Sequence, residues 1–114
     1  MVFNILTFRT RSPDRDRKSD ELRFKSVKSA LDEVISGVSS EINGLQKRID
    51  AQLQQAFHIM DMSGEYSERS KQDEQNIVEL ETQIKIAKER LKALKKQLGV
   101  YETLQKELSK LQSE

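Results

Sequence analysis

The residues that could carry out acid–base or metal chemistry are few in this 114-residue sequence. It has one histidine, His58, and no cysteine, which rules out a disulfide framework and a zinc site built on thiolates. Neighbouring carboxylates such as Asp73 and Glu74, or Glu79 and Glu81, do not share a helix face and so cannot act as a pair. His58 is expected on a helix surface or at an interface. The sequence also lacks the phosphate, dinucleotide and nucleophile motifs of common enzymes. We therefore expect no enzyme, no metal site and no cofactor.

The N-terminal arm, residues 1–18, offers contact chemistry instead. It begins with an apolar contact patch: Val2, Phe3, Ile5, Leu6 and Phe8. Five basic residues that could contact anions follow it: Arg9, Arg11, Arg15, Arg17 and Lys18. The first residues favour an extended, strand-like conformation. The patch could dock on the protein's own helices or a second copy, on a partner's groove, or on a membrane surface. The basic part could bind phosphate groups weakly, which leaves nucleic acid as a weakly supported partner, or form a solvated linker.

The composition points to long helices as the elements that position these residues. Hydrophobic residues make up 35% of the chain and charged residues 34%, with one proline and a net charge of +1. Such a chain is one domain at most and cannot bury the core of a globular enzyme. No apolar run is long enough to span a membrane, so we expect no transmembrane segment. The sequence also shows no secretory signal, and the cytoplasm is the default expectation.

Apolar residues recur at spacings of three and four in two segments, which predicts two amphipathic helices. The first stripe comprises Phe24, Val27, Leu31, Val34, Val38, Ile42, Leu45, Ile49, Leu53, Phe57 and Met60. The second comprises Ile77, Leu80, Ile84, Ala87, Leu91, Leu94, Leu98 and Tyr101, after which it slides to Leu104, Leu108 and Leu111. The second stripe is a regular heptad seam typical of a coiled coil. In the first, the successive four-residue spacings from Val34 to Val38 to Ile42 predict a stutter that relaxes supercoiling.

The signals at the ends of these segments set the expected boundaries. Ser19, followed by two acids, predicts the start of a first helix over residues 19–62. A polar, acidic turn region is expected at 63–73 and a second helix at 74–112. Ser70 with an acid three residues later resembles a capping box.

The two segments have similar lengths and predict an all-α fold, an antiparallel two-helix coiled-coil hairpin. One continuous helix is the alternative, because the heptad phase runs on through the polar positions Ser63, Tyr66, Ser70 and Asp73. Apolar residues beside the seams widen both faces beyond a two-helix interface: Ile35, Ile59, Val78, Ile86, Val100, Leu104 and Leu111. Widened faces suit a bundle of three or four helices. We therefore expect a homo-oligomer or a helical protein partner that completes a bundle.

Charge is unevenly distributed along the second segment. Residues 61–81 contain seven acids and two bases, a net −5, and residues 85–96 contain six bases and one acid, a net +5. A parallel homodimer would place like charges together, so this pattern favours antiparallel pairing.

The leading functional hypothesis is a non-enzymatic coiled-coil scaffold or adaptor for protein–protein interaction and self-assembly. Its expected interaction seam is Val27, Leu31, Val34, Val38, Ile42, Leu45, Ile49, Ile77, Leu80, Ile84, Leu91, Leu94 and Leu98. The alternatives are a protein that binds a membrane surface or nucleic acid through its arm, and a small helical-hairpin chaperone or secretion-associated adaptor.

Overall fold

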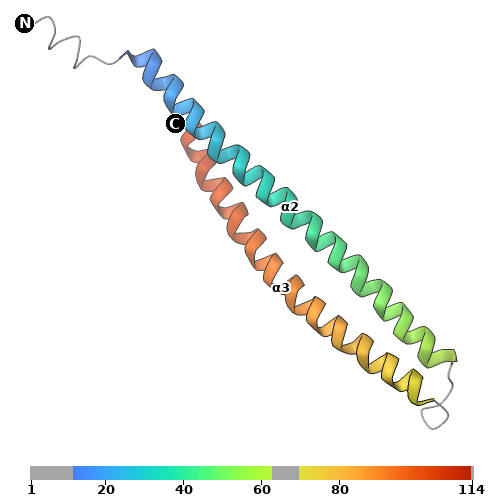
Figure 1. Ribbon diagram of the computed structural model, residues 1–114. Helices are drawn as coiled ribbons and strands as arrows, with labels where there is room; N and C mark the ends of the chain where they lie inside the picture. The colour runs from blue at the N-terminus through green and yellow to red at the C-terminus, as the bar shows by residue number, and fades with distance from the viewer. Residues whose placement is uncertain (1–11, 63–69, 114) are drawn as a thin grey trace, which may run out of the picture.

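The computed structural model describes residues 12–62 and 70–113, and these form two long α-helices. Helix α2 spans Pro13–Met62 and helix α3 spans Lys71–Ser113. The two helices pack against each other in opposite directions along the length of α3 (Figure 1). The hairpin prediction is therefore confirmed, and the single continuous helix is excluded. The apolar patch of residues 2–8, Arg9, Arg11 and the turn residues 63–69 lie outside the described residues.

Helix α2 begins six residues before the boundary expected at Ser19. The Ser12 hydroxyl accepts a hydrogen bond from the Arg15 amide at 3.4 Å, and the Ser12 carbonyl accepts one from the Asp16 amide at 3.0 Å. Proline is favoured at the first position of a helix, because it has no amide hydrogen to leave unsatisfied there. Asp14 and Asp16 in the first turn add a favourable interaction with the helix dipole. Residues 13–18 of the expected arm are therefore helical.

Helix α3 begins immediately after Ser70. The Ser70 hydroxyl accepts a hydrogen bond from the Asp73 amide at 3.1 Å, and its carbonyl accepts one from the Glu74 amide at 3.1 Å. The first half of the capping box is thus present, and it starts the helix three residues earlier than residue 74.

The seam of α2 follows an unbroken heptad pattern. The residues that are buried or half-buried along it are Leu31, Ile35, Val38, Ile42, Leu45, Ile49, Gln52, Ala56 and Ile59. The expected stutter is absent, because Ile35 lies at the seam where the sequence pattern suggested Val34. Val34 is 39% exposed and Val27 is 49% exposed, so both lie beside the seam. Phe57 is likewise 58% exposed, since Ala56 takes the seam position and one residue turns the helix by about 100°.

The seam of α3 continues without the expected slide. Ile77, Leu80, Ile84, Ala87, Leu91 and Leu94 are buried, and Leu98 and Tyr101 are half-buried. Beyond Tyr101 the half-buried positions are Gln105 and Leu108, whereas Leu104 and Leu111 are exposed. The seven-residue repeat thus continues past Tyr101, with the polar residue Gln105 at the next seam position.

The two ends of the hairpin differ in packing. We call residues 42–62 and 71–94 the turn half, and residues 13–41 and 95–113 the open half. Every buried residue among those described lies in the turn half, and its most buried side chains are Ile49 and Leu94. The core cluster joins Ile49 of α2 to Ile84, Ala87 and Leu91 of α3. The seam of the open half is only half-buried.

Candidate interaction surface

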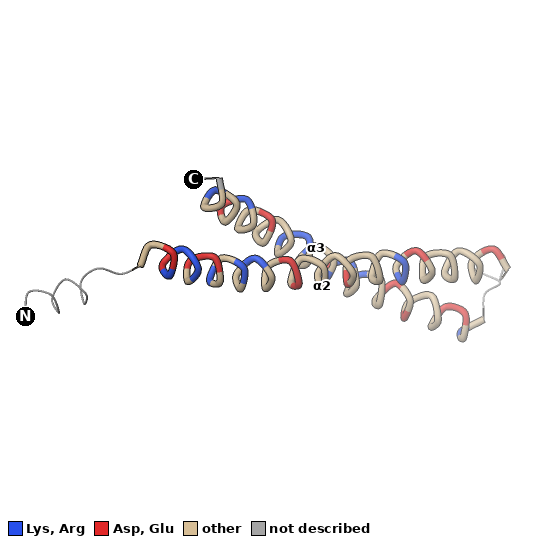
Figure 2. Tube along the Cα trace, turned by 90° about the horizontal axis from the view of Figure 1, so that it is seen from above, with Lys and Arg blue, Asp and Glu red and all other residues tan. Residues whose placement is uncertain are grey.

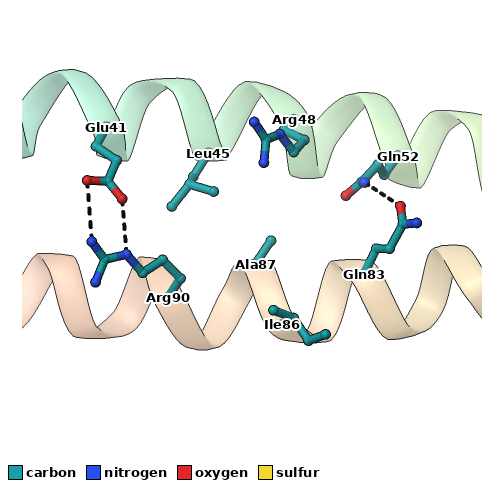
Figure 3. A pocket seen from close by; sticks show the side chains of 8 residues that line it. All are labelled: Glu41, Leu45, Arg48, Gln52, Gln83, Ile86, Ala87 and Arg90. Carbon is teal, nitrogen blue, oxygen red and sulfur yellow. Dashed lines mark hydrogen bonds and ion pairs between the residues drawn. The ribbon is translucent and has the colours of Figure 1, made fainter.

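Among the residues that the structure describes, three polar contacts connect α2 to α3 across the seam and fix how the helices align. The Arg90 guanidinium donates to both carboxylate oxygens of Glu41, at 3.0 and 3.4 Å. The other two contacts are Gln52 with Gln83, at 2.9 Å, and Gln105 with Asp32, at 2.8 Å. Figure 3 shows the first two around one hollow, with Glu41 pointing toward Arg90 and Gln52 toward Gln83. Because each contact is satisfied at only one alignment, together they favour a single register.

Gln52 makes an incomplete contact at its seam position. Its side-chain amide nitrogen donates to Gln83, but its Oε1 is buried and accepts no hydrogen bond from a described residue. A buried acceptor without a donor destabilises the folded state. Gln52 therefore favours one register at a cost in stability.

Asp32 lies at the centre of the polar contact in the open half. Its carboxylate accepts a hydrogen bond from Lys28, at 2.9 Å, and one from Gln105 of the facing helix, at 2.8 Å. The hydrogen bonds from Lys28 and Gln105 lower the pKa of Asp32 from its usual 3.8. The charged form of Asp32 is thus the form that bridges the two helices.

Five exposed apolar side chains lie on one side of the hairpin in its open half. We call them the apolar surface: Val27, Val34, Val100, Leu104 and Leu111, which are 39% to 65% exposed. The ion pair between Glu41 and Arg90 lies beside the seam. Val27 and Val34 lie two heptads and one heptad before Glu41, and Leu104 and Leu111 lie two and three heptads after Arg90. Residues at heptad spacing lie on the same side of a coiled coil. Val100, four residues before Leu104, falls on the same face. The apolar surface is therefore continuous across both helices.

The apolar surface extends into a groove at the open end. Phe24 and Val27 of α2 and Leu108 and Leu111 of α3 line it, and it encloses about 850 Å³. Asp20, Glu21, Lys25 and Lys28 also line this groove. Apolar side chains accompanied by charged ones are typical of a surface that contacts another protein.

The residues expected to form the interaction seam divide into two groups. Those packed between the two helices are Leu31, Val38, Ile42, Leu45, Ile49, Ile77, Leu80, Ile84, Leu91, Leu94 and Leu98. Val27 and Val34 belong instead to the apolar surface. Sequence reasoning found Val100, Leu104 and Leu111 as apolar positions, but it did not place them beside Val27 and Val34. Within each helix the signal is present, because Val27 and Val34 are seven residues apart and so are Leu104 and Leu111.

The remaining sequence candidates lie apart from one another. Arg15, Arg17 and Lys18 are exposed on the first turns of α2, and Arg17 forms an ion pair with Asp14 at 2.7 Å. His58 is exposed on α2. Across residues 12–62 and 70–113, no group of three or more histidine and acidic residues is placed to hold a metal ion.

None of the helices described is both long enough and apolar enough to cross a membrane. The comparisons with known proteins add no relative: no family model, curated protein or solved structure matches this chain.

Proposed function

We propose that this protein is a non-enzymatic coiled-coil scaffold that binds helices of another protein through its apolar surface. The observation that carries the proposal is the apolar surface itself, five large side chains that the hairpin leaves 39% to 65% exposed. Contiguous exposed apolar side chains of this kind mark protein interaction sites. Burying them would remove from water the apolar side chains that lie beside the half-buried seam of the open half.

The shape of this face favours a helix as the bound element. The apolar surface follows α2 and α3 for several turns, so an amphipathic helix laid along it would contact apolar side chains from both helices. Ala30 and Gly37 follow Val27 and Val34 by three residues and lie on the same face. A Cβ atom added at Gly37 would meet no atom within 4 Å, so this part of α2 is open to close approach.

The experiment that tests the proposal is site-specific photocrosslinking in cells of the native host. A photoreactive residue replaces Leu104 in the full chain, and the control carries it at Lys96, an exposed position facing away from the seam. We expect a covalent adduct with a second polypeptide at residue 104 but not at 96. The adduct should be lost when Val100→Glu is added, because a charge on the same face opposes apolar packing. An adduct at neither position, or equal adducts at both, would overturn the proposal.

Truncation of the N-terminal arm distinguishes the scaffold proposal from the alternatives in which the arm binds a membrane surface or nucleic acid. A chain beginning at Ser12 keeps all of α2 and α3 but lacks the apolar patch and Arg9 and Arg11. The scaffold proposal expects the residue-104 adduct to persist in this truncated chain. Loss of binding to anionic liposomes or to nucleic acid in the truncated chain would instead favour an arm-based function.

A further inference from the structure

The side of the hairpin that carries the apolar surface continues past the ion pair of Glu41 and Arg90 toward the turn. One row of α2 on this side recurs every seven residues: Val27, Val34, Glu41 and Arg48. Arg48 therefore lies on the same side as the apolar surface, one heptad beyond the ion pair. It lines the hollow of Figure 3, which encloses about 430 Å³ and is lined from both helices. The hollow thus continues this side of the hairpin into the turn half.

Within α2, the charge of Arg48 has no acidic neighbour. Arg48 is exposed and forms no ion pair with any described residue. The positions three and four residues away, where a helical neighbour would stand, hold uncharged residues: Gly44, Leu45, Ala51 and Gln52. Figure 2 shows that charged residues crowd the first part of α2 and become sparse beyond residue 33. Helix α2 therefore does not compensate this charge.

The facing helix supplies no acid to Arg48 either. The antiparallel register set by the ion pair brings Arg48 opposite Gln83, one heptad further toward the turn. The Gln83 side chain is neutral and already engaged, since it accepts a hydrogen bond from Gln52 at 2.9 Å and donates one to Glu79 at 3.4 Å. The hairpin thus leaves a guanidinium at the edge of the hollow without a carboxylate to bind.

Apolar contact area runs along the same side to the hollow. A second row recurs every seven residues in α3: Ile86, Ala93 and Val100. Val100 belongs to the apolar surface, whereas Ile86 lines the hollow and is 62% exposed. On α2, Gly44 and Ala51 follow Glu41 and Arg48 by three residues, and a Cβ atom added at Gly44 would meet no atom within 4 Å. A helix laid along this side therefore meets no large side chain of α2 in that row before it reaches Ile86.

We propose, in an inference that rests on the proposed function, that the helical partner runs past the ion pair and into this hollow. There it places an aspartate or glutamate against Arg48 and an apolar side chain against Ile86. Arginine binds a carboxylate through two parallel hydrogen bonds, which fixes position as well as charge. Val34 and Arg48 are two heptads apart, about 21 Å along the helix. The partner helix should therefore carry its acidic residue about two heptads from the residue that contacts Val34.

The charges of this side favour a helix of another protein over a second copy. From residue 20 to 62 of α2 and along α3, the acids at the heptad positions that face this side are Asp20, Glu41, Glu79 and Glu107. Each already accepts a hydrogen bond from a side chain of its own copy. A second copy laid along this side would have to break one of these contacts to supply a carboxylate to Arg48. A nucleic acid is disfavoured because the same four carboxylates would repel its phosphates.

Photocrosslinking in cells of the native host tests how far the partner extends. The photoreactive residue replaces Ile86 in the full chain, and the control carries it at Lys88, which is exposed and lines a groove on the other side of the seam. We expect residue 86 to form an adduct with the same polypeptide that residue 104 captures, and residue 88 to form none. Fragmentation of the peptide bound at residue 86 should reveal an aspartate or glutamate within about two helical turns of the attachment point.

A matched pair of charge reversals tests the role of Arg48. Arg48→Glu should lower the yield of the residue-86 adduct by about fivefold or more, because it replaces an attraction by a repulsion. Lys47→Glu makes the same change of charge at the adjacent exposed residue, which lies outside the hollow, and should leave the yield unchanged. Arg48→Lys keeps the charge and should retain most of the adduct. Circular dichroism of each purified variant establishes that it remains helical.

The possible outcomes distinguish the extension of the partner from the proposed function. An adduct at residue 104 with none at residue 86 would overturn the extension and leave the proposed function standing. The extension would also be overturned by a residue-86 adduct that Arg48→Glu does not weaken, by a bound peptide without an acid in that range, or by a residue-86 adduct with the mass of two copies. No adduct at either residue 104 or residue 86 would overturn the proposed function together with the extension.

Discussion

The turn half and the open half share one heptad pattern but pack differently. In the turn half, the small residues Ala56 and Ala87 occupy seam positions and are buried, and Ile49 is only 2% exposed. In the open half the seam contains Lys28 and Gln105, and its apolar residues stay half-buried. The same half carries the apolar surface. This difference shows that heptad spacing aligns the two helices, whereas the size and polarity of the seam residues decide whether the side chains between the helices are buried.

The largest expected effect comes from truncating the same residue type in each half. Ile49 and Ile35 occupy equivalent heptad positions two heptads apart, but Ile49 is buried and Ile35 is half-buried. Ile49→Ala should reduce the free energy of unfolding by about 2 to 5 kcal/mol, because it leaves a cavity in the core cluster. Ile35→Ala should cost about 1 to 2 kcal/mol, because less apolar area is lost. Urea unfolding at one fixed protein concentration measures both, and equal losses would remove the distinction between the halves.

A smaller effect of opposite sign is expected at the polar seam position of the turn half. Gln52→Leu removes a buried acceptor that has no donor among the described residues and leaves Gln83 exposed to water. The free energy of unfolding should rise by about 1 kcal/mol. Gln55→Leu is the matched control, since Gln55 is exposed beside the seam and should change little. Destabilisation by Gln52→Leu would show that its contact with Gln83 outweighs the unsatisfied oxygen.

The smallest effect concerns the polar contact of the open half and depends on pH. Because folding lowers the pKa of Asp32, its charged form stabilises the hairpin at pH values above the usual 3.8. That contribution is lost as the pH falls through the lower folded-state pKa. The wild type should therefore unfold at a higher temperature than Asp32→Asn at neutral pH. The difference between the two unfolding temperatures should disappear in acid.

Asp50→Asn is the control for this measurement, because the Asp50 carboxylate bonds to Gln46 of its own helix and not across the seam. If the unfolding temperatures of the wild type and Asp32→Asn differ by the same amount at every pH, the assigned role of Asp32 is wrong.

Most of the fold could be predicted from spacing alone. The seam from Ile77 to Tyr101 follows directly from its alternation of three and four. The predicted start of the second helix at residue 74 is three residues late, although the cap expected at Ser70 is present. The differences along the two seams share one cause. The spacing of apolar residues favours Val34 over Ile35 and Leu104 over Gln105, whereas the heptad phase places Ile35 and Gln105 at the seam.

The candidate surface was harder to predict, because it depends on the alignment of the two helices. Val27 and Leu104 are far apart in the sequence, and the contact of Glu41 with Arg90 in the structure shows that their faces coincide. The identity of that ion pair is not apparent from either helix, since each carries many charges of both signs. The start of α2 could have been found, because Ser12 and Pro13 followed by acids is a common helix N-terminus.

The central claim is that the turn half forms a closed core and the open half does not. Native-state hydrogen exchange of the full chain, resolved by residue, tests it most directly. Amides near Ile49 and Ile84 should exchange most slowly, and those near Leu31 and Leu108 should exchange much faster, at a rate that falls when a helical partner binds. Equal protection of the two halves in the isolated chain, or slower exchange in the open half, would contradict the claim.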